Sequence, residues 1–466
     1  MTKSLYDTNK ELKQSLLAME KLILEKAYEW GRNVYKAILE YIDGLIKQYR
    51  VKELTLEHKR GVWYTTRLGK IKIERRQYRD QSGNYHYPLD QLFGMKKYRH
   101  ITSDVKGFAL ELAASTTFRK SEEILRKTAA IDLSHQTIHR LLTRAADMYL
   151  EQEKQETNWF SATGELPVSE NKRVARLFME ADGVMLSLQR AKARKTEVKL
   201  GIAYEGWEKV GRDRYRTGNK ICHADIASSD TFWTGMTLKL HRKYDLANVK
   251  DIILGGDGGS WIKEGIEYFG GRFQLCRYHL NRELRYKLGS EVKTIKLLQE
   301  SIDKEDIDSI YNILNEAALK VKGDKAKEIK RLSRYIRSNA SGLRDYRHTV
   351  INDGNLRRTG AIEGNVDKLI ARRMKNRGMS WTIEGIRRML AVRFLLREGK
   401  LSEWLYHGSG DIKNYGITTK RINRVTDKTI KQNYIDWFSA GLPALYGPHS
   451  SRFWVKILKS LTEGGI

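Results

Sequence analysis

Two aspartates are the residues of this chain best suited to chemistry. Asp182 follows the apolar run RLFME and precedes Gly183, and Asp257 ends the apolar run DIILGG inside a glycine-rich turn. Such positions place a carboxylate within or near the end of a strand, where a cation and a phosphate can approach it closely. Either aspartate could instead belong to an ordinary turn or cap the next helix. As a pair on neighbouring strands, they favour an acidic metal site.

A site of this kind would do phosphodiester chemistry. Cleavage and strand transfer need an activated oxygen nucleophile and charge compensation at phosphorus, which two divalent ions about 4 Å apart can supply. Hard oxygen ligands hold Mg²⁺, and Mn²⁺ can substitute, so two such ions are the expected cofactor. Spacing alone leaves the third carboxylate open among the acids of the appropriate later region, which are Asp353, Glu363, Asp367 and Glu384.

The charge balance favours nucleic acid as the partner. Among 466 residues, 86 Lys+Arg stand against 57 Asp+Glu, which gives a formal net charge of +29. A field of this sign attracts polyanions. Only two cysteines occur, Cys222 and Cys276, and no stretch reaches the ~18 uninterrupted apolar residues of a membrane span. We expect a soluble protein of the bacterial cytoplasm, associated with the nucleoid and with no membrane partner.

The pattern of apolar residues divides the chain into segments. Strand-like runs that alternate with helices predict an α/β core with a mixed sheet covered by helices. The N-terminal helix has one apolar face, which packs on the rest of the chain or on a second copy. The predicted segments are the long helix with possible dimerisation over 1–56, a basic β-hairpin over 57–100, a helix-turn-helix domain over 101–160, the first part of the core over 170–285, a helical insertion over 286–350, the second part of the core over 351–400 and a C-terminal segment over 401–466.

The hairpin and the helix-turn-helix are the predicted DNA-binding elements. Ser134 is a good N-cap, so the residues after it would lie where a recognition helix meets base edges and phosphates. Alternating charge on a hairpin is also typical of a solvated face, and two such helices can form an ordinary helical hairpin. The expected DNA contacts are Lys70, Lys72 and Arg75 on the hairpin and His135, Gln136, His139 and Arg140 on the helix.

Four motifs in order resemble a known family. They are MEADGV, ILGGDGGSWI, FQLCRYHLNREL and GAIEGNVDKLIARRMKNRGMSW. Together with the long helix, hairpin and helix-turn-helix before them, they resemble the ISLre-type prokaryotic insertion-sequence transposases. These are relatives of the Mutator superfamily with a ribonuclease-H-like catalytic core of the DDE type. The likeness spans nearly the whole chain, and the ordered set is far more specific than any single motif.

The resemblance assigns roles to particular residues. It implies that Asp182, Asp257 and Glu363 are the metal ligands, and the likeness alone selects Glu363. The interval of 106 residues between Asp257 and Glu363 is too long for a bare core, and the helical insertion explains the excess. Cys276 and His279 match a Cys-x-x-His element of the superfamily. His279 could position the scissile phosphate or pack beneath the site, whereas a zinc site completed by Cys222 and the histidine after it is disfavoured because adjacent strand residues face opposite ways.

Basic and aromatic residues near the predicted site add candidate DNA contacts. A basic cluster beside a metal site favours phosphate binding, although it could also be a solvated helix face. Two tryptophans could stack on an unpaired base, although buried tryptophans are more common. The residues concerned are Arg372, Arg373, Lys375 and Arg377 in the cluster, with Trp261 and Trp381 as the tryptophans.

These features predict a DDE transposase that binds the inverted-repeat ends of a transposon and joins them to target DNA. Because two ends must be processed, we expect at least a homodimer on double-stranded DNA. Two alternatives remain open at this point. One is a metal-dependent nuclease or host-adopted recombinase of the same fold, and the other is a DNA-binding regulator without catalysis.

Overall fold

The structure is a computed structural model that describes residues 5–48, 54–93, 95, 100–350, 356–376 and 378–406. It divides into two compact units, Met1–Ala145 with Leu396–Ile466, and Ala146–Leu395. Arg377 and nearly all of the predicted C-terminal segment lie outside the described residues. Of the helices in the described ranges, none is long and apolar enough to cross a membrane.

The first unit opens with the long helix that the sequence predicts. Helix α1 spans Leu5–Gln48. In its later turns Leu39, Ile42 and Ile46 are buried and pack in one core with Tyr64 of the hairpin. Their spacing of three and four residues puts them on one helix face, which explains the amphipathic pattern. Within this unit, intrachain packing covers that part of α1.

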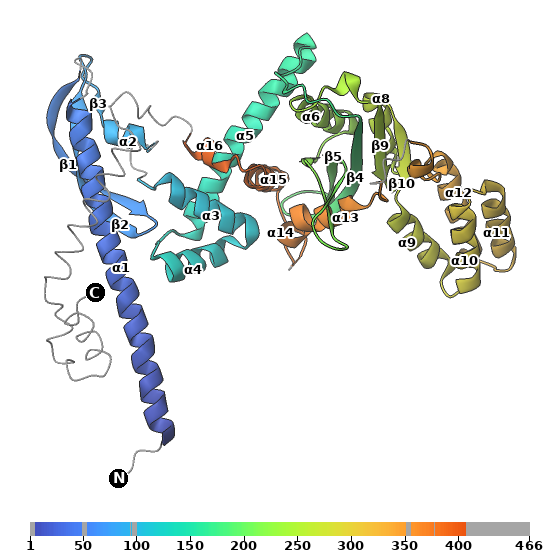
Figure 1. The fold of residues 1–466 in the computed structure, drawn as a ribbon, viewed down its shortest axis with the longest axis horizontal. Helices are drawn as coiled ribbons and strands as arrows, with labels where there is room; N and C mark the ends of the chain where they lie inside the picture. The colour runs from blue at the N-terminus through green and yellow to red at the C-terminus, as the bar shows by residue number, and fades with distance from the viewer. Residues whose placement is uncertain are drawn as a thin grey trace. The chain divides into compact units, whose positions relative to one another are not determined.

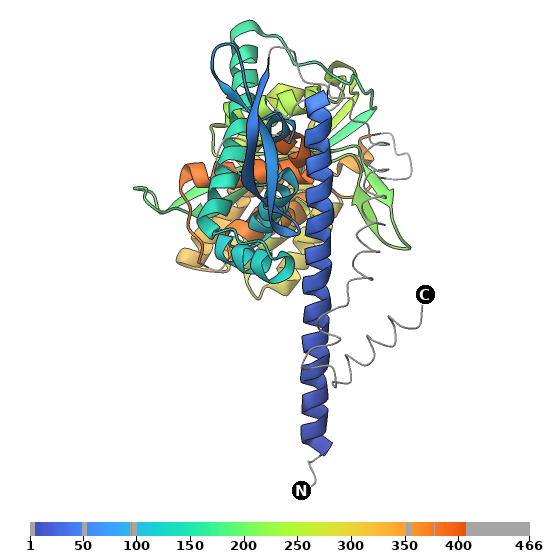
Figure 2. The ribbon, with the colours of Figure 1, turned by 90° about the vertical axis from the view of Figure 1, so that its left-hand side faces the viewer.

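The predicted hairpin packs along this helix. Strands β1, Thr55–Thr66, and β2, Gly69–Arg79, are antiparallel and meet at a tight turn, with Gly69 at a φ of 101°. That conformation favours glycine, as expected for the turn that the sequence predicts. The short strand β3, Tyr85–His86, and helix α2, Pro88–Leu92, follow. Figures 1 and 2 both show α1 running alongside β1 and β2.

Two helices joined by a short turn form where the sequence predicts a helix-turn-helix. Helix α4 ends at Ala129, Ala130 adopts a left-handed conformation with φ 50°, and the next helix begins at His135. Ser134 caps that helix, because its Oγ accepts a hydrogen bond from the Thr137 N–H at 3.2 Å. The helices are α3 (Ser103–Ser115), α4 (Phe118–Ala129), α5 (His135–Thr163) and, late in the chain, α16 (Leu401–Tyr406).

A five-stranded mixed sheet forms the centre of the second unit. Its strand order is β10-β9-β4-β5-β8, with β4, β5 and β8 antiparallel and β4, β9 and β10 parallel. The strands are β4 (Arg176–Ser187), β5 (Lys195–Tyr204), β8 (Ile221–Asp225), β9 (Asp251–Gly256) and β10 (Arg272–Leu275). A small ribbon that the sequence pattern did not predict, β6 (Trp207–Lys209) and β7 (Tyr215–Thr217), is inserted between β5 and β8. The predicted mixed α/β core is confirmed.

Helices pack against this sheet and form one face of its core. Phe232, Trp233 and Met236 of α6 lie against strand residues such as Leu177 and Leu254. The helices before β10 are α6 (Ser229–His241), α7 (Ser260–Lys263) and α8 (Gly265–Phe269), with a 3-10 turn η1 (Leu246–Asn248).

A helical insertion with its own core follows β10, as predicted. Leu275 at the end of β10 packs with buried leucines and isoleucines of four helices. Figure 1 shows these helices beside the β10 edge of the sheet. These helices are α9 (Arg277–Leu288), α10 (Val292–Asp303), α11 (Ile307–Leu319) and α12 (Asp324–Ser338), followed by the 3-10 turns η2 (Ala340–Gly342) and η3 (Tyr346–His348). The chain then returns to the sheet through α13 (Ala361–Val366), the π-helical turn η4 (Asp367–Ala371), α14 (Arg372–Met374) and α15 (Ile383–Arg397).

Candidate active site

Asp182 lies in the middle of β4, the central strand of the sheet. It pairs with Leu200 of β5, and it is 8% exposed. The parallel partner β9 ends near this level, since Glu180 pairs with Gly255. The Gly183 N–H donates a hydrogen bond to Asp182 Oδ1 at 2.8 Å. Asp182 therefore lies two residues beyond the last β4 residue that pairs with β9, next to the carboxyl end of β9.

Asp257 lies directly after β9, in the glycine-rich turn. Its Oδ1 accepts a hydrogen bond from the Gly259 N–H at 2.9 Å, and its backbone carbonyl accepts one from the Tyr335 hydroxyl at 2.7 Å. Gly258 has a φ of 94°, and a Cβ there would lie 2.4 Å from Oδ1 of Asn339. The turn thus needs glycine for both conformation and space. The predicted placement of the two aspartates on neighbouring strands is confirmed.

A buried carboxylate on β4 anchors the helix that carries Glu363. Glu180 is 2% exposed, and its oxygens accept hydrogen bonds from the N–H groups of Gly360, Ala361 and Ile362 at 2.9, 3.1 and 3.1 Å. These are first-turn donors of α13 that have no partner within the helix. The Tyr204 hydroxyl also donates to Glu180. Glu180 therefore fixes where α13 begins and so where Glu363 stands.

The sequence interpretation overlooked Glu180. Its signal was present, because the run RLFMEAD places a charged residue in a strand whose neighbours are apolar. Carboxylates are rarely fully buried unless they are paired or hydrogen-bonded. Burial raises the pKa of Glu180, and the hydrogen bonds from Tyr204 and from the start of α13 oppose that rise.

Two of the predicted carboxylates, Asp257 and Glu363, act electrostatically on the third, Asp182. The pKa of Asp182 is raised to about 7, first because the side chain is buried and then because of the negative charges of Glu363 and Asp257. Arg282 opposes this rise. Like charges shift a carboxyl pKa in this way only when they are close and poorly screened. Charged residues from three other parts of the sequence, Asp257, Arg282 and Glu363, thus affect the pKa of Asp182.

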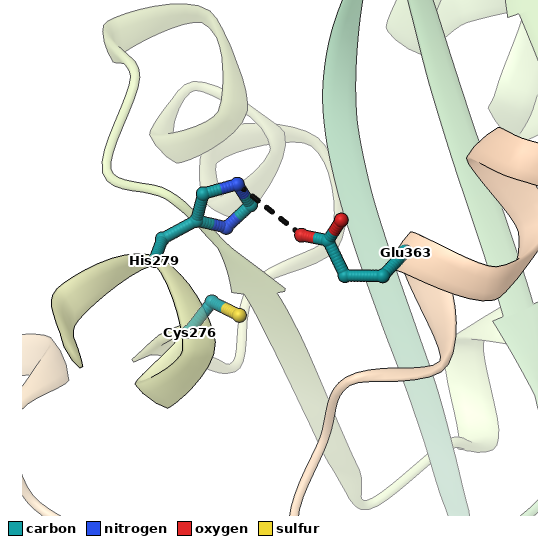
Figure 3. A group of neighbouring side chains, drawn as sticks. All are labelled: Cys276, His279 and Glu363. Carbon is teal, nitrogen blue, oxygen red and sulfur yellow. Dashed lines mark ion pairs between the residues drawn. The ribbon is translucent and has the colours of Figure 1, made fainter. Parts of the chain in front are cut away.

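Glu363 also faces a histidine and a cysteine. His279 Nε2 lies 3.2 Å from Glu363 Oε1, and Cys276 stands one helical turn before His279 (Figure 3). The ligand atoms of Cys276, His279 and Glu363 all lie within 4.8 Å of one another, while Asp182 and Asp257 lie outside this group. Burial lowers the pKa of His279, and the charge of Glu363 opposes that change.

The basic residues that follow α13 differ in how exposed their side chains are. Arg372 is exposed and pairs with Asp367 at 2.6 Å, and Lys375 is also exposed. Arg373 is only 3% exposed, and its guanidinium lies 5.1 Å from the ring centre of Trp381. The prediction that Arg373 contacts DNA is therefore wrong for this structure, because the side chain belongs to the interior.

The two tryptophans are also held by the protein. The Trp381 Nε1–H donates to the Met374 carbonyl at 2.8 Å. The Trp261 ring packs edge-on against Phe232 at 5.3 Å, within the core of the sheet. Both rings are half-buried. That either ring stacks on an unpaired base near the cut stays a prediction.

On the hairpin, only part of the predicted basic set faces solvent. Lys70 and Lys72 are exposed on one face of β2. Arg75 lies on the opposite face, is 5% exposed, and donates to Asp90 at 2.8 Å. Its guanidinium also stacks on the Tyr87 ring. The prediction of a DNA contact by Arg75 is wrong, because its charge is paired inside the unit.

The predicted recognition residues gather at the start of α5. Gln136 and Arg140 are exposed. The His135 ring pairs with Glu122 at 2.8 Å. His139 is exposed and contacts the Phe118 ring edge-on, with 5.1 Å between ring centres. The side chains of Gln136, His139 and Arg140 are thus exposed enough to contact a ligand, whereas His135 is half-buried against α4.

Cys222 and His223 do not join the other cysteine. They lie on β8, the opposite edge of the sheet from β10, which precedes Cys276. Burial lowers the pKa of His223 to about 3. A zinc site that combines these two residues with Cys276 and His279 is therefore excluded by the strand order.

The fold and site together define an α/β protein in which a buried carboxylate on the central strand of a mixed sheet is within electrostatic reach of two others. A family model described as "Uncharacterised protein family (UPF0236)" matches residues 11–405, and the chain belongs to this family. A UPF0236 protein of Caldanaerobacter subterraneus subsp. tengcongensis is 27% identical over 409 residues, covering 86% of this chain and 82% of the relative. A UPF0236 protein in the vanSb 3′ region of Streptococcus gallolyticus is 25% identical over 394 residues, covering 82% of this chain and 83% of the relative.

Proposed function

We propose that this chain is a DDE transposase with a ribonuclease-H-like core. The observation that carries the proposal is the convergence of Asp182, Asp257 and Glu363, which come from β4, the end of β9 and α13. The electrostatic effect of Glu363 and Asp257 on Asp182 supports the same grouping. A mixed sheet with the first acid on its central strand and a helical insertion before the third is consistent with this core.

The donor set fits Mg²⁺. All three side chains offer hard oxygen ligands, and Mg²⁺ is bound through a few carboxylates together with water and phosphate oxygens. The negative charge around Asp182 is poorly compensated by the protein itself, since the leading causes that lower its pKa are one backbone hydrogen bond, from Gly183, and one cation, Arg282. When bound, divalent ions would supply activation of the attacking oxygen and charge compensation at phosphorus.

The protein's own groups have separate roles in this proposal. Asp182 and Asp257 form the rigid part of the site, because strand pairing and the glycine turn fix their backbones. Glu363 depends on Glu180, which holds the first turn of its helix. His279 positions the Glu363 carboxylate through the contact at 3.2 Å. The reaction first hydrolyses a phosphodiester to leave a free 3′-hydroxyl, which then attacks a phosphodiester of the target DNA.

DNA binding is assigned to the first unit and to the surface near the site. Lys70 and Lys72 on the hairpin, with Gln136 and Arg140 on α5, are exposed and suited to phosphates and base edges. The formal net charge of +29 supports a polyanionic partner. Because a transposon has two ends, we propose at least a dimer on the DNA.

The names of the relatives are consistent with a mobile element. The protein from Caldanaerobacter carries a name that joins eleven locus designations. A gene that copies or moves itself is expected at many loci of one genome. This multiplicity has no evident reason for a nuclease or a regulator that serves one purpose in the cell.

An assay of DNA products tests the proposal. The purified full-length chain is incubated with Mg²⁺ and a plasmid that carries the sequences flanking its own coding region. We expect strand breaks at the element boundaries and products in which the freed ends are joined to other DNA. Breaks without joined products would point to a nuclease. Specific binding with no breaks would point to a regulator, and either result would contradict a transposase.

A further inference from the structure

Glu363 belongs to two different sets of donor atoms. On one side its negative charge, like that of Asp257, raises the pKa of Asp182. On the other side it faces the Cys276 thiol and the His279 imidazole of α9. We infer that Cys276, His279 and Glu363 form a second metal site, which takes a thiophilic divalent cation such as Zn²⁺. Binding of this cation does not depend on the proposed function, whereas its effect on DNA cleavage rests on it.

The geometry is close to what zinc requires. Tetrahedral Zn²⁺ bonds of about 2.0–2.3 Å to nitrogen, oxygen and sulfur put pairs of ligand atoms roughly 3–4 Å apart. The His279 Nε2 and Glu363 Oε1 atoms are 3.2 Å apart, within that range. All three ligand atoms lie within 4.8 Å, so a small movement of side chains completes the set. Three protein ligands leave one position of a tetrahedral Zn²⁺ ion for a water molecule.

Local structure explains why the cysteine and histidine meet. Cys276 is the N-cap of α9, and His279 lies in its first turn. Residues three apart on a helix face the same way. Figure 3 shows both side chains directed toward Glu363, which approaches from α13. Because α9 and α13 are far apart in the sequence, the cluster exists only in the folded chain.

Two donor atoms of the cluster lack hydrogen-bond partners. His279 is 4% exposed, and its Nδ1 has no such partner among the described residues. The Glu363 Oε1 atom is likewise buried and makes no hydrogen bond of good geometry there, although His279 is near. Buried polar atoms in native proteins are nearly always satisfied, so two unsatisfied atoms in one cluster favour a ligand there. The nitrogen that lies 3.2 Å from Glu363 Oε1 is the other one, Nε2.

The position of the sulfur favours its ionised form once a cation is present. The backbone N–H groups of Tyr278 and His279 point at the Cys276 thiol, as the start of a helix allows. Burial nonetheless raises the pKa of Cys276.

The choice of metal follows from the donor types. Thiolate and imidazole select Zn²⁺, whereas Mg²⁺ prefers oxygen ligands only. Because both sets use the Glu363 carboxylate, we expect the two kinds of cation to compete for it. Zn²⁺ at this site would therefore withdraw the third carboxylate from Asp182 and Asp257, and it would inhibit Mg²⁺-dependent cleavage.

Titration with Co²⁺, a spectroscopic substitute for Zn²⁺, tests the site on the full-length protein without DNA. We expect the intense visible bands of a tetrahedral complex and a sulfur-to-cobalt charge-transfer band, both displaced by one equivalent of Zn²⁺. The Cys276→Ser variant should lose the charge-transfer band, and its affinity should fall more than about 100-fold, beyond the usual cost of losing an outer-shell partner. Glu363→Gln should weaken binding while the charge-transfer band remains.

The only other cysteine provides a matched control, since Cys222 lies on the opposite edge of the sheet. Cys222→Ser should bind Co²⁺ as the unaltered chain does. No charge-transfer band in the unaltered chain, or a band lost in Cys222→Ser and kept in Cys276→Ser, would overturn the inference. Asp182→Asn should abolish cleavage yet keep the band, which separates a failure of this site from a failure of the proposed function.

Discussion

The crowding of negative charge around Asp182 has a measurable cost for the ion-free protein. The folded-state pKa of this buried carboxyl is about 7, raised by burial and by Glu363 and Asp257, whereas an unfolded aspartate titrates near about 3.9. A raised carboxyl pKa means that folding opposes ionisation. The stability of the protein therefore falls as pH rises from the unfolded value through the folded one. The Asp182→Asn substitution tests this, because asparagine has nearly the same shape as aspartate and carries no charge.

The expected gain follows from the two pKa values. Each pKa unit corresponds to about 1.4 kcal/mol, so ionising Asp182 in the folded protein costs about 4 kcal/mol near about pH 8. Near about pH 5 most folded molecules hold the proton already, and the cost falls to about 1.5 kcal/mol. Asp182→Asn should thus stabilise the ion-free protein by these amounts, with the larger gain at the higher pH.

Urea unfolding in the presence of a chelator, followed by tryptophan fluorescence, measures this gain at both pH values. Trp233 is fully buried in the same unit and reports its unfolding. Asp213→Asn is a matched control, because Asp213 is exposed in the ribbon between β6 and β7. An Asp182→Asn variant that is no more stable than the unaltered chain, or that gains equally at both pH values, would refute the close approach of the three carboxylates.

Two further predictions concern other parts of the chain. Glu180→Ala should lower the free energy of unfolding by about 3–5 kcal/mol, because it leaves buried donors at the start of α13 without an acceptor; a loss below about 1 kcal/mol in urea unfolding would contradict its anchoring role. Lys70→Ala combined with Lys72→Ala should weaken binding to all DNA sequences and reduce the slope of log affinity against log salt by about 2. Fluorescence anisotropy across a salt series measures that slope, and an unchanged slope would remove the hairpin from the DNA interface.

Local patterns in the sequence were enough to predict most elements of the fold. The turn at Gly69, the start of α5 after Ser134 and the strands that carry the two aspartates all follow from short-range rules on capping, turns and apolar spacing. The ribbon of β6 and β7 was not predicted because its strands are only three residues long, too short to show the alternation of a strand. Such a pattern is indistinguishable from a loop.

The arginines illustrate two kinds of error. Arg75 differs in parity from Lys70 and Lys72 along β2, so strict alternation already predicts that it faces the other way. Arg373 could not be excluded in this manner. Its burial depends on the chain folding back so that Trp381 covers it, which is a tertiary contact with no periodic signal.

The third carboxylate shows where local rules end. Glu363 was singled out by family resemblance alone, because four acids lay in the same region. Its position depends on hydrogen bonds between Glu180 and the start of α13, which join residues about 180 positions apart in the sequence. The neighbouring thiol and imidazole, of Cys276 and His279, also meet Glu363 only through a contact between distant parts of the sequence. Only the folded chain brings these groups together.

The most direct test of the proposed active site compares single carboxylate variants in Mg²⁺-dependent cleavage at the element boundaries. Asp182→Asn, Asp257→Asn and Glu363→Gln should each lower the cleavage rate at least about 100-fold, since several kcal/mol of charge stabilisation is lost. Glu384→Gln, which changes another acid of the same region, should cleave like the unaltered chain. Cleavage that survives Glu363→Gln but is lost in Glu384→Gln would contradict the assignment of the third ligand, and cleavage that survives all three triad variants would contradict the site itself.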